Sequence, residues 1–250
     1  MIRFLSYILP VVVAFSLVAC RQSTAERRIS NGRADSLLLH RVRQRIEDKK
    51  RLEELRTELM SSELGRSIAH YKPIIKKYAK RYGFDWRLIA AQIVQESGFQ
   101  TKARSHVGAR GLMQLMPYTA REISQELDIE YIMKNPRENI TAGIYHLHKQ
   151  YRLFSDAPFA DRTKLALASY NAGAGRVFDA QDIARYFKLQ TNRWINVRPY
   201  LAMLKKSDWQ LHLQVWPEGR PRHGYFYGYK ETINYVESIW ATYIDYCKIM

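Results

Sequence analysis

Helical periodicity marks the middle of the chain. Four apolar side chains recur there with the three- and four-residue spacing of one helix face: Leu88, Ile89, Ile93 and Val94. Asp85 stands where a helix N-cap is expected, and Gly98 stands where a helix can end. Together these signals predict a helix over residues 85–97.

Similar patterns predict further helices on both sides. Their expected ranges are 36–61, 73–82, 117–127, 136–153, 161–172, 180–187, 195–205 and 230–246. Pro73 is an expected helix start, and Gly173 and Gly175 an expected helix end. Residues 207–228 combine Pro, Gly and aromatic residues and predict a loop. Because strand patterns are scarce, we expect one mainly α domain with an N-terminal helical extension.

The beginning of the chain predicts an export signal. Arg3 supplies a positive start, and residues 8–19 form an apolar run too short for a comfortable membrane span. The run ends in Leu17-Val18-Ala19-Cys20, which resembles the lipobox of bacterial lipoproteins. We therefore expect residues 1–19 to be a signal peptide and Cys20 to carry lipid. The alternative is an ordinary signal peptide with a chance cysteine.

An anchored protein of this kind would work in the cell envelope. Residues 20–65 are expected to form a polar tether and the helical extension, and residues 66–250 the main domain. We expect the protein to lie in the periplasm and to be anchored by its lipid to a membrane, which we expect to be the outer membrane. Cys247 is the only cysteine after Cys20, so no disulfide framework is expected.

The charge balance favours a polyanionic partner. The chain holds 40 Lys and Arg against 24 Asp and Glu, a net charge of +16, and 46% of its residues are hydrophobic, enough for a globular core. Nucleic acid, membrane head groups and acidic peptides all fit such a charge. An exported protein does not meet intracellular nucleic acid, and the sequence contains no nucleic-acid recognition motif. We therefore expect no nucleic acid as partner.

Glu96 is the candidate catalytic residue. It follows Ile89 by seven positions and Ile93 by three, so it projects from the apolar face of its helix. Burial there disfavours the charged carboxylate and raises its pKa, which suits a general acid. The alternative is a structural carboxylate paired with Arg104 or Arg110.

The sequence predicts no metal and no cofactor. His146 and His148 are two positions apart on a helix and so point to different faces, and no HExxH motif occurs. Gly173-Ala174-Gly175 lacks the preceding strand and the spacing of a dinucleotide-binding loop.

Four short motifs occur together and in order in one known family. They are Glu96-Ser97-Gly98-Phe99, residues 111–117 (GLMQLMP), residues 166–173 (ALASYNAG) and residues 231–236 (ETINYV). With them, residues 71–246 resemble the soluble lytic transglycosylase (SLT) catalytic domain, most closely that of the membrane-bound lytic murein transglycosylase F group. This resemblance implies a lysozyme-like fold and peptidoglycan glycan strands as the substrate.

The resemblance also implies a reaction. Glu96 would protonate the oxygen between N-acetylmuramic acid and N-acetylglucosamine, then accept a proton from the muramic C6 hydroxyl, which closes a 1,6-anhydro ring without water. Glycosidases usually use two carboxylates, and Glu96 is the one carboxylate with a role here. The implied substrate-binding residues are Ser97, Met113, Gln114, Tyr170, Asn171 and Tyr235, with Met113 lining the groove and Tyr170 supporting Asn171.

Two other functions remain open at this point. A goose-type lysozyme activity would use the same fold with water as the acceptor, and a non-catalytic module would only bind peptidoglycan. The transglycosylase F group also carries a large N-terminal domain that resembles a solute-binding protein. About fifty residues separate Cys20 from the expected catalytic domain, too few for a domain of that kind. We therefore expect that regulation through such a domain is absent or comes from a partner.

Overall fold

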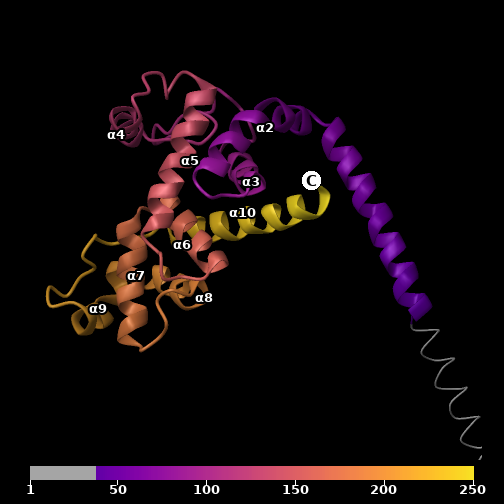
Figure 1. Ribbon diagram of the computed structural model, residues 1–250. Helices are drawn as coiled ribbons and strands as arrows, with labels where there is room; N and C mark the ends of the chain where they lie inside the picture. Colours follow the sequence, from indigo (N-terminus) through magenta and orange to yellow (C-terminus); the bar gives the residue numbers. More distant parts are fainter. Residues whose placement is uncertain (1–37) are drawn as a thin grey trace, which may run out of the picture. The chain divides into compact units, whose positions relative to one another are not determined.

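The computed structural model describes residues 38–250 (Figure 1). The chain divides into two compact units, residues 1–55 and residues 56–250. Residues 38–61 are helical, which confirms the helix expected over 36–61 for its described part. The expected signal peptide and Cys20 lie outside the described residues.

The second unit is built from helices, whose bounds are as follows. They are α2 (Glu63–Arg81), α3 (Trp86–Ser97), α4 (Pro117–Leu127), α5 (Pro136–Arg152), α6 (Phe159–Ala172), α7 (Ala174–Tyr186), α8 (Trp194–Val197), α9 (Trp209–Val215) and α10 (Tyr229–Ile249), with 3-10 turns at Arg198–Met203 and Lys206–Asp208. Within residues 38–250 the only β pairing consists of isolated bridges at Arg104–Arg110 and Arg110–Leu115. The mainly α architecture expected from the sequence is confirmed.

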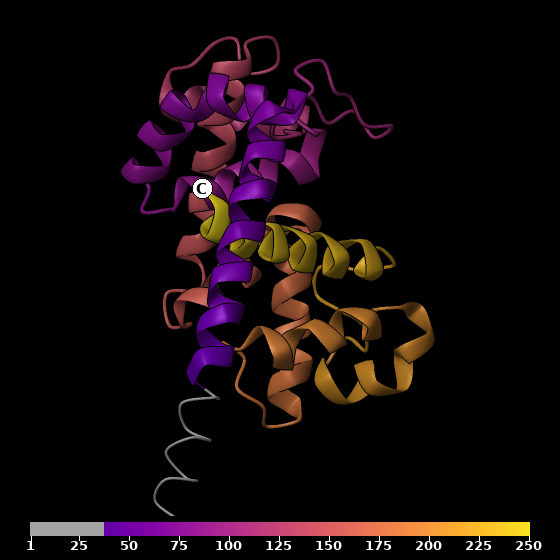
Figure 2. The ribbon, with the colours of Figure 1, turned by 90° about the vertical axis from the view of Figure 1, so that its right-hand side faces the viewer.

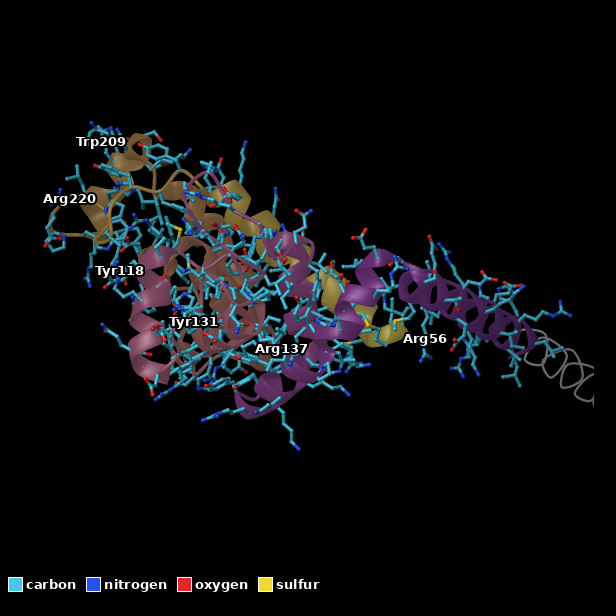
Figure 3. The ribbon with its side chains drawn as sticks, turned by 90° about the horizontal axis from the view of Figure 1, so that it is seen from above. Arg56, Tyr118, Tyr131, Arg137, Trp209 and Arg220 are labelled. Carbon is cyan, nitrogen blue, oxygen red and sulfur yellow. The ribbon has the colours of Figure 1, made fainter. Side chains whose placement is uncertain are left out.

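Helix α10 occupies the centre of this unit. It crosses between a group formed by α2 to α5 and a group formed by α7 to α9 (Figures 1 and 2). It packs against α3 and against α6, and α5 packs against α6 from the first group. Trp209 and Arg220 mark the α9 end of the unit, far from Arg56 in the view of Figure 3. The last helix of the chain thus joins segments that are distant in sequence.

Helix α3 forms where its periodicity predicted it. Leu88, Ile89 and Ile93 are fully buried in the core. At its start, Asp85 Oδ1 accepts a hydrogen bond from the Arg87 backbone N–H at 2.9 Å. At its end, Gly98 takes a left-handed conformation with φ 57°. These caps leave Glu96 in the last turn of the helix.

Three other expectations were wrong. Pro73 lies inside α2, which begins ten positions earlier because the Ser62 hydroxyl caps it by accepting from the Gly65 N–H at 3.0 Å. Gly175 does not end a helix but lies within α7, where an added Cβ would stand 2.4 Å from the His223 ring. The expected loop 207–228 contains α9. For Gly175 the close contact with His223 shows tertiary packing overriding a local rule.

One close approach involves a glycine of α5. Gly143 of α5 lets the helix backbone touch Met113, because a Cβ at this glycine would lie 2.4 Å from Met113 Cβ. No helix within residues 38–250 combines the length and the apolar character that a bilayer span requires.

Candidate active site

Glu96 faces a cavity of about 470 Å³ at the meeting point of α3, α6, α10 and the loop after α3. The lining residues are Gln95, Glu96, Ser105, Val107, Ala109, Gln114, Met116, Tyr170, Asn171, Glu231, Asn234 and Tyr235. All four sequence motifs thereby contribute residues to the wall of the cavity. A cavity with convergent polar groups is the expected form of a small-ligand or catalytic site.

A tyrosine of α10 forms a hydrogen bond to the carboxyl of Glu96. Tyr235 Oη donates to Glu96 Oε1 at 2.5 Å, and Gln92 Nε2 donates to Tyr235 Oη at 3.0 Å. Burial raises the pKa of Glu96 to about 8, while the hydrogen bond from Tyr235 opposes this rise by stabilising the carboxylate. Glu96 is therefore largely protonated at neutral pH, as a general acid must be.

A structural ion pair does not explain Glu96. Within residues 38–250 no cation lies in salt-bridge contact with its carboxyl, and its hydrogen-bond partner is the neutral Tyr235. The alternative pairing with Arg104 or Arg110 is therefore wrong. Those two arginines face each other across an isolated β-bridge in the loop instead.

Tyr170 ties the loop to α6. Its hydroxyl donates to the Met113 backbone carbonyl at 2.7 Å, and its ring packs on His146 with 4.8 Å between the ring centres. Burial, together with the nearby charge of Glu96, raises the pKa of Tyr170 well above its usual value. Burial also lowers the pKa of His146 to about 4, so this imidazole is neutral at physiological pH.

The motif GLMQLMP is held by side-chain hydrogen bonds, some from other elements and one from within the motif. Ser97 Oγ donates to the Leu112 carbonyl at 2.9 Å, and Gln114 Nε2 donates to the Gly111 carbonyl at 2.9 Å. Asn139 of α5 accepts from the Met113 N–H at 2.8 Å and donates to the Arg110 carbonyl at 3.1 Å. The loop is therefore fixed by polar bonds as well as by packing.

Asn171 is oriented from α10. Its Oδ1 accepts from the Thr232 hydroxyl at 2.7 Å. This bond fixes the orientation of the amide, and the amide nitrogen of this lining residue remains available as a donor.

The predicted site residues fall into two groups. Glu96, Gln114, Tyr170, Asn171 and Tyr235 line the cavity, whereas Ser97 and Met113 do not. The expectation that Met113 lines the groove is corrected, because its side chain is fully buried against Gly143 and only its backbone serves the site.

Several contributors to the site were not predicted from the sequence, four of them notable. Met116 and Glu231 line the cavity, and Gln92 and Asn139 are buried polar residues that hold it from behind. A signal for Gln92 existed, since it is a polar residue inside the apolar stretch of α3.

The loop beside the cavity is strongly basic. Residues 97–121 contain no Asp or Glu, and Lys102, Arg104 and Arg110 are exposed in it. Within residues 38–250 these three side chains make no ion pair with a carboxylate. Within the same range, no three His, Cys, Asp or Glu side chains are grouped to hold a metal ion. The site therefore offers an acid and hydrogen-bonding groups, and the neighbouring loop is cationic.

Comparison with known proteins gives consistent matches. Residues 73–192 match the family model described as Transglycosylase SLT domain. A membrane-bound lytic murein transglycosylase F of Desulfosudis oleivorans is 40% identical over 185 residues, which cover 72% of this chain and 37% of that protein. Its counterpart in Marinobacter nauticus is 35% identical over 175 residues, which cover 69% of this chain and 32% of that protein.

A solved structure is also similar. It is the X-ray structure of an inactive mutant of the lytic transglycosylase Slt from Pseudomonas aeruginosa, with 29% identity and a TM-score of 0.48 over 72% of this chain and 24% of that one. The chain thus spans about a third of the length of the curated relatives and less of this structure.

Proposed function

The chain belongs to the transglycosylase SLT family, as its four ordered motifs predicted, and from this membership we propose that it is a peptidoglycan lytic transglycosylase. In this proposal Glu96 is the catalytic acid and base. The observation that supports it most directly is a carboxyl with a raised pKa that opens on a cavity and accepts a hydrogen bond from a neutral tyrosine.

The first step needs the protonated form of Glu96. Its proton passes to the oxygen that joins C1 of N-acetylmuramic acid to N-acetylglucosamine, and the C1–O bond breaks. The acetamido group of the muramic sugar stabilises the positive charge that develops at C1. The hydrogen bond from Tyr235 then stabilises the carboxylate that Glu96 has become.

The second step uses that carboxylate as a base. It accepts the proton of the muramic C6 hydroxyl, and the C6 oxygen bonds to C1 and closes the 1,6-anhydro ring. The proton returns to Glu96, so no water is consumed and the enzyme is restored. Asn171 and Gln114, which line the cavity, are proposed to hold the muramic sugar during both steps.

One observation favours a second candidate. Glu231 lines the same cavity and supplies a second carboxylate, which most glycosidases use to activate water or to act as a nucleophile. A lysozyme-like hydrolase is therefore the runner-up. It shares the acid Glu96 with the first proposal and differs in the acceptor.

Product analysis separates the two functions. The purified protein is incubated with murein sacculi, and the soluble fragments are analysed by mass spectrometry. A transglycosylase yields anhydro-ended fragments, each lighter by one water than the reducing fragment a hydrolase yields. Sacculi left intact by a folded protein that still binds them would instead mean a binding module.

The location of the protein is part of the proposal. The curated relatives carry the words membrane-bound in their names, which supports the cell envelope as the place of action. The lipobox ending at Cys20 supports lipid anchoring, with the outer membrane as the proposed destination. The exposed Lys102, Arg104 and Arg110 of the basic loop would then attract the acidic stem peptides of the wall.

A further inference from the structure

Gln92 contacts the catalytic pair from the protein interior, and we propose that it is a positioning residue that fixes the direction of the Tyr235 hydroxyl. The inference goes one step beyond the proposed function and rests on it, because it concerns how the acid form of Glu96 presents its proton. No cavity-lining role is involved, since Gln92 is fully buried and does not line the cavity.

The geometry is a chain of two hydrogen bonds. Gln92 and Glu96 lie four positions apart on α3 and so share one face of the helix. Between them stands the hydroxyl of Tyr235, which receives the Gln92 amide N–H at 3.0 Å and donates to Glu96 Oε1 at 2.5 Å. The two α3 side chains thus hold one α10 hydroxyl from both sides.

The direction of the second bond follows from the first. A tyrosine hydroxyl has a single proton, and it can either donate to a carboxyl oxygen or accept from a protonated carboxyl. When Gln92 donates to Oη, the hydroxyl proton is directed at Glu96 Oε1. Oε1 is then an acceptor, and the proton of the acid form resides on Oε2.

This placement matters for the chemistry. A proton on Oε1 would be shared with Tyr235 and turned away from a substrate. A proton on Oε2 is free to be transferred. Gln92 therefore keeps the transferable proton on the oxygen that Tyr235 does not occupy, although Gln92 touches neither the substrate nor Glu96 in this role.

Packing alone gives a poor account of a glutamine at this position. Gln92 Oε1 is buried and has no hydrogen-bonding protein partner within residues 38–250. A buried polar atom without a partner is unfavourable, so an apolar side chain of the same shape should fit here at little cost. A role in orienting Tyr235 explains why an amide would be useful at this site.

The other groups around Glu96 do not compete for this role. The titratable groups that line the cavity with it are Tyr170 of α6 and Glu231 and Tyr235 of α10. The hydroxyl of Tyr170 is engaged by the Met113 carbonyl, and the loop contributes the uncharged Ser105 and Gln114.

A double-mutant cycle tests the inference. Turnover of sacculi is measured for the wild type, Gln92→Met, Tyr235→Phe and the double variant. In the wild-type background, Gln92→Met should lower kcat about five- to tenfold. This is the effect expected for the loss of one hydrogen bond that acts in the transition state. In the Tyr235→Phe background it should cost less than about twofold, because the hydroxyl through which it acts is gone.

Controls separate positioning from packing. Ile89→Met changes a buried residue of the same helix without touching the hydrogen bonds, and its turnover should stay near that of the wild type. Thermal unfolding should show Gln92→Met at least as stable as the wild type. If Gln92→Met does not fold, Gln92→Leu is taken through the same cycle.

A second measurement is independent of turnover. The pKa of Glu96 is followed by NMR of its side-chain carboxyl in the four proteins. Loss of the Gln92 donor weakens the bond from Tyr235 to the carboxylate, so the pKa of Glu96 should rise in Gln92→Met. It should not rise further when the same change is made in Tyr235→Phe.

The outcomes are distinct. An equal loss of turnover in both backgrounds, an unchanged turnover, or a pKa of Glu96 that does not respond to Gln92→Met would each overturn the positioning role. Failure of the proposed function would look different: the wild type would release no anhydro-ended fragments, while the NMR cycle would still report whether Gln92 acts on Glu96 through Tyr235.

Discussion

Tyr235 Oη and Glu96 Oε1 lie 2.5 Å apart although 139 positions separate the two residues in the chain. The contact exists because α10 packs along α3 and brings its buried face to the end of that helix. The same packing desolvates the carboxyl that the tyrosine binds. The packing of α10 on α3 therefore both raises the pKa of Glu96 by burial and supplies Tyr235, whose hydrogen bond opposes that rise.

Replacement of the proposed acid should abolish cleavage. Glu96→Gln keeps the shape of the side chain but can neither donate an acidic proton nor accept one. Loss of a general acid or base commonly costs about 10²- to 10⁴-fold, and here one residue serves both steps. Turnover of sacculi should fall by at least that factor while the circular dichroism spectrum stays unchanged. A folded Glu96→Gln protein that keeps a substantial share of wild-type turnover would refute the assignment.

The same substitution should change the pH dependence of stability. Glu96 titrates near 4.5 in the unfolded chain and at about 8 in the folded protein, so protonated Glu96 contributes stability that is lost as pH rises between those values. The Gln side chain cannot ionise, so the stability of Glu96→Gln relative to the wild type should increase as the pH rises across this window. Thermal unfolding at a series of pH values measures the difference, and a gap that is constant from pH 4 to pH 9 would contradict the raised pKa.

Gly143→Ala should destabilise the protein despite the helical preference for alanine. On propensity alone, Gly to Ala inside a helix stabilises by about 1 kcal/mol. The new Cβ would lie 2.4 Å from Met113 Cβ, and overpacking of this kind costs about 1–3 kcal/mol. We expect a lower Tm and reduced turnover, because Met113 carries the carbonyl that binds Tyr170. A higher Tm would contradict this prediction, because it would show that the loop around Met113 can move aside without loss of stability.

Removal of residues 21–55 from a soluble form of the protein should leave most of its turnover of sacculi intact. The four motifs and every residue that lines the cavity belong to the unit of residues 56–250. A longer deletion of residues 21–60 is the matched comparison. It also removes Leu59, which packs against the core, and should lower stability by about 1 kcal/mol or more. A folded but inactive 21–55 deletion would show that the first unit serves catalysis.

Cys20→Ser should prevent attachment of lipid. The prediction follows from the sequence Leu17-Val18-Ala19-Cys20, since only a thiol at the first mature position can be acylated in this way. Labelling of cells with a fatty-acid analogue, followed by isolation of the protein, measures the effect. Equal labelling of wild type and variant would remove the basis for the proposed anchor.

Helix positions explain which parts of the site could be predicted. Glu96, Tyr170 and Tyr235 lie on periodic helices, so their faces follow from spacing and from the apolar residues beside them. Their convergence did not follow from spacing, because it depends on the packing of α10 against α3 and α6. That step required the resemblance of the four motifs to a known family.

Loop geometry explains what could not be predicted. The motif GLMQLMP has no periodicity that tells which methionine faces inward. In the structure Gln114 adopts a left-handed φ of 44°, Met113 is buried against Gly143, and Met116 lines the cavity. A left-handed conformation at a glutamine is uncommon and has no marker in the sequence.

The central position of α10 has a consequence for the time at which the protein can act. A ribosome adds Tyr235 long after Glu96, and a chain that is still being made or exported has no hydroxyl to bind that carboxyl. A chain cut short before residue 229 would leave the acid at the edge of an open cavity. Assembly of the site is thereby deferred until α10 has been made, so under the proposed function a fragment that lacks this helix should not cleave peptidoglycan.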